Sequence, residues 1–196
     1  MTDLNQFLQK NKEKIHELLN NMWQTIEKMA FQFEDKIPEI DLDNTHGNFV
    51  TINDGWGEAY YPNPSITFPF GEIGYSLDGL YCVYAVFVEN LNEKHLEYFL
   101  TIPHENDDIK MELYGGDDCF STFYSSDDSD DLDEIMKSIK DSSEGVIQIE
   151  LSIEAFPEEE LKGKLLEQIL ALYEFLSKNE LLARFPIYDK KEEESD

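Results

Sequence analysis

The chain has 196 residues, of which 41% are hydrophobic and 13% aromatic, and its formal net charge at pH 7 is −28. This length suits one folded domain, and the apolar fraction is too high for a disordered acidic tail. No apolar run approaches the ~20 residues of a membrane-spanning helix, a cleaved signal peptide is not expected, and two cysteines inside apolar stretches favour a cytoplasmic protein without disulfides.

A long amphipathic helix is predicted at residues 3–35. Its apolar residues recur at intervals of three and four, which places them on one stripe of the helix. Pro38 cannot continue the helix. A stripe of this kind usually packs on the protein's own sheet, and the alternative is the seam of a coiled-coil dimer.

The segment that follows, residues 37–61, is rich in turn residues and contains one short predicted strand at 49–52. Further strands are predicted at 66–70, 72–77 and 80–89, and the dipeptide Asp78-Gly79 marks a hairpin between the last two. The run from Leu80 to Val88 is apolar on both faces. We therefore expect it at the centre of the sheet, with both faces covered.

The second half of the chain mixes strands and helices. Residues 91–100 fit a short helix, although 98–102 fit a strand equally well, and strands are predicted at 109–113, 119–124 and 146–153. A short helix is expected at 129–139, and a long one begins near Pro157 and ends near Pro186.

This order predicts an α+β fold: a mainly antiparallel sheet of about five to seven strands flanked by long N- and C-terminal helices. Residues 1–188 would form a single α+β domain, and the acidic C-terminal tail, residues 189–196, would be frayed.

Negative charge is concentrated in the middle of the sequence. Residues 37–104 contain ten acids and one lysine, and residues 105–160 contain nineteen acids and three lysines, whereas both terminal helical segments are nearly neutral. Such a surface repels nucleic-acid phosphates and anionic membranes, and it attracts basic proteins. We expect the outward side of the sheet to be densely anionic and to engage a basic protein surface. The alternative is that the carboxylates only keep the protein soluble and monomeric.

One acidic string, Asp41-Leu42-Asp43-Asn44-Thr45, resembles the first motif of haloacid dehalogenase-like phosphohydrolases. In that family the first aspartate is the nucleophile and the second is the general acid, so the resemblance implies a metal-dependent phosphohydrolase that uses Asp41 and Asp43. Asp117 and Asp118 would then correspond to a later acidic motif of the family. The family's motif follows a buried parallel strand, whereas the segment before Asp41 is short and contains a proline.

Candidate cation ligands occur in a second acidic string. The weak metal candidates are Asp127, Asp128, Asp130 and Asp131. The string lacks the glycine and the terminal glutamate of an EF-hand loop, and the start of a helix already accounts for several carboxylates. The four histidines are scattered and suggest no zinc site. No cofactor is expected.

The predicted binding site surrounds Trp56, which lies between two glycines. Asp54, Glu58, Tyr60 and Tyr61 are its neighbours in the sequence. Aromatic rings beside carboxylates suit recognition of basic side chains through cation–π contact and ion pairing. The alternative is that Trp56 folds back onto the edge of the sheet and covers the core.

Three functions are compatible with these features. The preferred hypothesis is a non-enzymatic, acidic protein-binding module such as a small chaperone, an immunity-type inhibitor or an adaptor, because the sequence contains no catalytic constellation. Its order of elements resembles that of type III secretion chaperones and YbjN-like folds, which are small, acidic and often dimeric, so a homodimer is one expectation. The alternatives are a nucleic-acid mimic, whose carboxylates imitate phosphates, and the phosphohydrolase.

Overall fold

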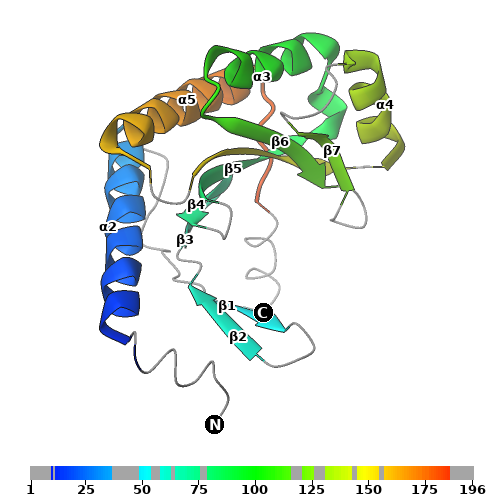
Figure 1. Ribbon diagram of the computed structural model, residues 1–196. Coiled ribbons are helices and arrows are strands. Elements are labelled where there is room, and N and C mark those ends of the chain that lie inside the picture. Colours follow the sequence, from blue (N-terminus) through cyan, green and yellow to red (C-terminus); the bar gives the residue numbers. More distant parts are fainter. Residues whose placement is uncertain are drawn as a thin grey trace, which may run out of the picture.

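The computed structural model describes residues 10, 12–36, 49–53, 58–62, 65–75, 79–115, 121–125, 131–142, 145–154 and 157–185 (Figure 1). The helices of this part are α2 (Lys12–Lys36), α3 (Glu93–Glu105), α4 (Leu132–Ser142) and α5 (Glu159–Lys178), with a 3-10 turn, η2, at Val88–Asn90. The strands are β1 (Phe49–Asn53), β2 (Glu58–Pro62), β3 (Ser65–Phe68), β4 (Gly71–Tyr75), β5 (Leu80–Phe87), β6 (Lys110–Gly115), β7 (Ser121–Ser125) and β8 (Val146–Ile153).

The central layer is a six-stranded sheet in the order β3-β4-β5-β8-β6-β7, in which every neighbouring pair is antiparallel. β8 lies between β5 and β6, so the last of the described strands joins the two hairpins β4–β5 and β6–β7 into one sheet. β1 and β2 pair separately as a two-stranded antiparallel sheet. The α+β class and the mainly antiparallel sheet predicted from the sequence are confirmed.

The described helices contribute to one hydrophobic core on a single face of the six-stranded sheet. An aromatic cluster lies at its centre: the ring centroid of Tyr84 in β5 is 6.3 Å from that of Phe33 in α2 and 6.3 Å from that of Tyr173 in α5. The Tyr84 hydroxyl donates a hydrogen bond of 3.0 Å to the carbonyl oxygen of Ile169 in α5. These contacts fix both long helices to the middle of the sheet.

β5 is buried on both faces, as its apolar sequence predicts. On the face opposite the helices, Ala183 and Phe185 pack against Tyr81, Val83 and Ala85. The backbone of residues 181–185 follows β5: Phe87 N–H donates to the Leu181 carbonyl and Ala183 N–H donates to the Ala85 carbonyl, each at 2.9 Å. The face of β5 opposite the helices is therefore covered by this short extended segment.

This segment corrects the predicted end of the last helix. α5 ends at Lys178, well before Pro186. Asn179 caps it, because its side-chain amide donates 2.8 Å to the Phe175 carbonyl, and Glu180 then adopts a left-handed conformation with φ 56°. The chain reverses at this point, so Leu181, which the sequence pattern assigns to the helix, lies in the extended segment.

The sequence left residues 98–102 open between a helix and a strand. In the structure they belong to α3, which begins after Asn92, and the Asn92 side chain accepts a hydrogen bond of 3.3 Å from the His95 N–H. β2 is not among the predicted strands. The single domain over 1–188 stays a prediction, and the predicted frayed tail lies outside the described residues. No described helix has the length and apolar character needed to cross a membrane.

Candidate functional site

The face of the six-stranded sheet that lies opposite the helices, here called the outer face, carries an unusual set of polar residues. Directly paired residues of neighbouring strands point to the same side. Because Glu72 pairs with Val83, Val83 with Glu150, and Glu150 with Glu112, one row of this face carries three glutamates across β4, β5, β8 and β6. The neighbouring positions, two residues along each strand, carry Tyr81 and Tyr114 together with Ser152 and Lys110.

Two of the glutamates are held by tyrosines. The Tyr81 hydroxyl donates a hydrogen bond to Glu72, and the Tyr114 hydroxyl donates one of 3.2 Å to Oε2 of Glu150. Burial raises the pKa of both tyrosines, and the charges of the adjacent glutamates raise these pKa values further, so the hydroxyls keep their protons and remain donors. Burial also raises the pKa of Glu72, while the hydrogen bonds from Tyr81 and Ser65 lower it.

The third glutamate, Glu112, lies directly opposite Glu150 in the antiparallel pair β6–β8. Side chains at directly opposite positions lie about 4.5–5.5 Å apart at Cβ, and like charges placed there are destabilising. No ion pair or hydrogen bond holds the Glu112 carboxylate among the described residues, whereas Tyr114 holds Glu150. Two like charges at such a pair repel each other, and a cation between the two carboxylates would reduce that repulsion.

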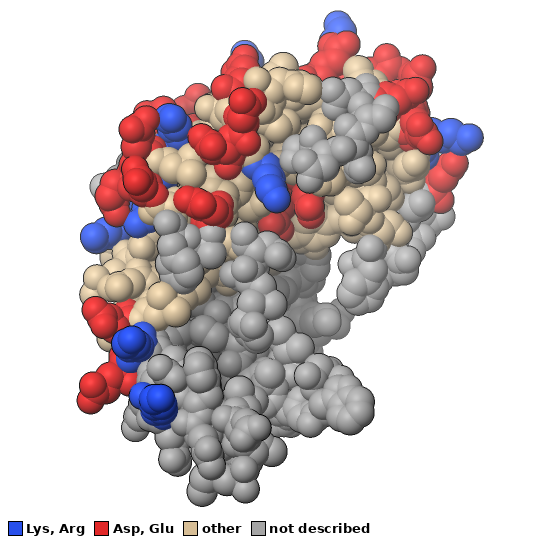
Figure 2. Space-filling view, viewed as in Figure 1, with Lys and Arg blue, Asp and Glu red and all other residues tan. Residues whose placement is uncertain are grey.

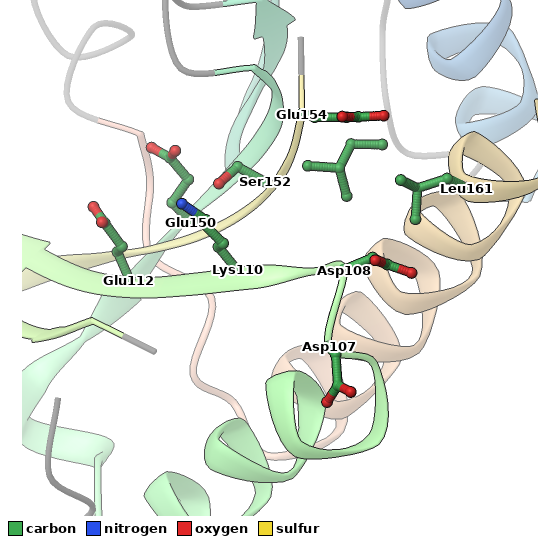
Figure 3. Close-up of a pocket in the computed structure, with 9 residues that line it drawn as sticks. Asp107, Asp108, Lys110, Glu112, Glu150, Ser152, Glu154 and Leu161 are labelled. Atoms are coloured by element: carbon green, nitrogen blue, oxygen red, sulfur yellow. The ribbon is translucent and has the colours of Figure 1, made fainter. Parts of the chain in front are cut away.

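A groove of about 690 Å³ opens beside this pair. Figure 3 shows its walls: Glu112 and Lys110 project from β6, Glu150 and Ser152 from β8, and Leu161 from the first turns of α5. Asp107 and Asp108, in the turn between α3 and β6, and Glu154, just after β8, complete the rim. Five carboxylates and one ammonium group therefore line the groove, so its lining is strongly anionic.

Acidic side chains are not confined to the outer face. In Figure 2 they also cover the helices α3, α4 and α5, with lysines among them. The sequence led us to expect a densely anionic outward side of the sheet as the main charged surface. The groove is distinguished by two carboxylates that face each other across β6 and β8, and not by the number of acids on this side of the molecule.

The binding residues predicted from the sequence lie elsewhere in the chain. Asp54 and Trp56 lie outside the described residues. Glu58, Tyr60 and Tyr61 belong to β2, where the backbone of Tyr60 pairs with Thr51 and that of Tyr61 pairs with Val50. The structure does not describe their side chains, so this site stays a prediction.

The alternative catalytic and metal candidates also fall largely beyond the described part. Asp41, Asp43, Asp117 and Asp118 lie outside it, as do Asp127, Asp128 and Asp130. Asp131 is described: its Oδ1 accepts a hydrogen bond of 3.1 Å from the Glu134 N–H and so caps α4. Within the described residues, no group of three or more His, Cys, Asp or Glu side chains is arranged to hold a metal ion.

Cys82 provides no nucleophile. It lies in β5, fully enclosed by the core, and burial raises the pKa of its thiol well above the usual range. A thiol of this kind stays protonated and behaves as a small apolar side chain, as its sequence context predicts.

Comparison with known proteins places the chain among proteins whose descriptions state no activity. A family model described as "Protein of unknown function (DUF3201)" matches residues 6–167. The structure is similar to that of a conserved hypothetical protein from Pyrococcus furiosus, with 25% sequence identity and a TM-score of 0.63, over 87% of this chain and 99% of that one. No curated protein matches the sequence.

Proposed function

The chain belongs to the DUF3201 family, and we propose that it is a non-enzymatic protein-binding module that holds a basic segment of a partner protein in the groove of the outer face. The single observation that carries this proposal is the direct opposition of Glu112 and Glu150 at the wall of that groove. An anionic substrate such as a phosphate ester would meet the same carboxylates and be repelled.

The chemistry of the groove suits a lysine or arginine side chain. Such a side chain has an aliphatic stem and a charged head. The stem packs on an apolar surface, and the charged head pairs with carboxylates at the other end of the site. Leu161 supplies apolar surface, and Glu112 and Glu150 supply the carboxylates. The groove volume of about 690 Å³ is in the range of sites that enclose small ligands, so it has room for basic side chains of an extended segment.

The tyrosines support this assignment by keeping one acceptor in place. The Tyr114 hydroxyl donates to Oε2 of Glu150 and so restricts the orientation of this carboxylate at the wall of the groove. A preorganised acceptor loses less conformational entropy on binding than a free glutamate does. As part of the same proposal, the reduced thiol of Cys82 agrees with a cytoplasmic location.

The proposal is tested by measuring the binding of a fluorescent arginine-rich peptide of about ten residues by anisotropy, at ionic strengths between about 0.05 and 0.3 M. The wild-type protein should bind the peptide with an affinity that falls steeply with salt. The double substitution Glu112→Gln with Glu150→Gln should weaken binding by about tenfold or more, because both carboxylates at the wall are lost.

A matched control removes the same number of charges elsewhere. Glu97 and Glu174 are exposed on α3 and α5, and their double substitution to glutamine should change the affinity by less than about twofold. Equal weakening in both double variants would mean that the peptide responds only to total charge, and the groove would lose its assigned role. Absence of any binding by the wild-type protein would also refute the proposal.

A further inference from the structure

The extended segment 181–185 fills a site that another part of the chain forms. This acceptor site consists of the outer face of β5 and the last residues of that strand, beyond its pairing with β4. Ala183 and Phe185 are buried in the site. Two backbone hydrogen bonds join the segment to β5, and a third, of 2.8 Å, runs from the Phe185 N–H to the Pro69 carbonyl. The acceptor site is therefore specific for an extended segment with this pattern of side chains.

The connection between α5 and this segment consists of two residues, Asn179 and Glu180, here called the hinge. Glu180 has φ 56°, in the left-handed region where the Cβ of a non-glycine residue is crowded by the backbone. Two contacts hold it there: its N–H donates 3.1 Å to the Ser177 carbonyl, and its own carbonyl accepts 2.8 Å from the side-chain amide of Asn90 in η2. The hinge thus folds the segment back onto its own chain at a conformational cost that an extended hinge does not carry.

We propose that the acceptor site also takes segment 181–185 of a second copy of this chain, so that two copies exchange their C-terminal segments. This inference goes beyond the proposed function and does not depend on the groove. The incoming segment has the sequence that fills the site within one chain, so it forms the same hydrogen bonds and apolar contacts.

The energetic gain of the exchange is the release of both hinges, and short connections under strain favour this kind of exchange. The entropy of association and the net charge of −28 on each copy oppose it. The exchanged dimer is therefore expected at high protein concentration and at an ionic strength that screens the repulsion.

The exchange is tested with a disulfide bond between copies. Val86 of β5 and Leu182 lie directly opposite each other, between the hydrogen bonds that join the segment to β5. The Cα atoms of such a pair are about 4.5 Å apart, which a disulfide can bridge. Full-length Val86→Cys and Leu182→Cys are mixed in equal amounts at about 0.3 M salt and mildly oxidised. Mass spectrometry of the cross-linked peptides should show a dimer joined through positions 86 and 182.

The matched control mixes Val86→Cys with Glu174→Cys. Glu174 is exposed on α5 before the hinge, so it does not move with the segment, and this mixture should give about tenfold less cross-linked dimer. A single chain that carries both Val86→Cys and Leu182→Cys should form the disulfide internally. That disulfide keeps the segment in its own acceptor site, so this variant should be monomeric by light scattering.

Variants of the hinge test its role in the exchange. Glu180→Gly removes the crowded Cβ and should lower the yield of the 86–182 cross-link about fivefold or more. Glu180→Pro should raise the yield, because proline fixes φ near −65° and the closed hinge needs a positive φ. Asn90→Ala removes the amide that holds the Glu180 carbonyl and should also raise it, and this variant leaves the backbone of the hinge unchanged.

The inference is overturned if the mixed variants give no 86–182 cross-link while the single chain with both cysteines forms its internal disulfide. Equal cross-linking in the Glu174→Cys control would overturn it too, because the disulfide would then report random collision. A yield that neither Glu180→Gly nor Asn90→Ala changes would have the same consequence. Peptide binding in the groove is measured separately, so the proposed function stands or fails independently of these results.

Discussion

Replacing Glu112 by glutamine should stabilise the protein while it weakens binding. Glu112 and Glu150 are directly paired across β6 and β8 and carry the same charge. At a carboxylate separation of about 6 Å and an effective dielectric constant of about 40–80, Coulomb's law gives about 0.7–1.4 kcal/mol of repulsion. Lys110 and mobile ions offset part of this, which leaves an expected gain of about 0.5 kcal/mol, in the range measured for cross-strand charge pairs.

The gain is measurable by urea unfolding at about pH 7 and low ionic strength, where the midpoint of Glu112→Gln should exceed that of the wild-type protein at an unchanged slope. The difference should shrink at about 1 M salt, because screening removes the repulsion that the substitution relieves. Glu97→Gln on α3 is the control and should leave the midpoint unchanged. A destabilised Glu112→Gln variant, or a gain that persists at high salt, would contradict the account of this pair.

Three other substitutions test the fold. Tyr84→Phe removes the buried 3.0 Å hydrogen bond to Ile169 and should cost about 1 kcal/mol, measured as a Tm lower by about 2–4 °C. Gly79→Ala should cost about 3 kcal/mol or more in urea unfolding, because φ is +154° and the new Cβ would lie 1.8 Å from the Ile153 carbonyl oxygen. Burial raises the folded-state pKa of the Glu72 carboxyl above the ordinary 4.5, so this carboxyl binds its proton more tightly in the folded protein than in the unfolded chain. The folded protein therefore loses stability as the pH rises from 4.5 through that pKa. In Glu72→Gln the urea midpoint should change less with pH over this interval. A wild-type midpoint that rises with pH over the same interval would contradict the assignment of this pH dependence to Glu72.

Much of the fold could be predicted because local patterns and tertiary structure agree. The continuous apolar run of β5 indicates a strand covered on both faces, and the alternation in β8 indicates one buried face and one polar face. The end of α5 was missed because neither glycine nor proline marks it. Asn179 and Glu180 end the helix. The next residues pair with the last residues of β5, beyond its pairing with β4, and this tertiary pairing leaves no local signal in the sequence.

The candidate site could not be predicted in the same way, because it depends on which strands are neighbours. Read alone, Glu112 and Glu150 are ordinary polar positions on half-buried strands, and a shift of one residue in the β6–β8 register would turn one of them to the other face. Glu112 and Glu150 face each other directly at the wall of a groove, and like charges at directly opposite positions are destabilising. A cationic ligand between the two carboxylates would offset this repulsion, and this is the physical reason for the proposed binding of a basic segment.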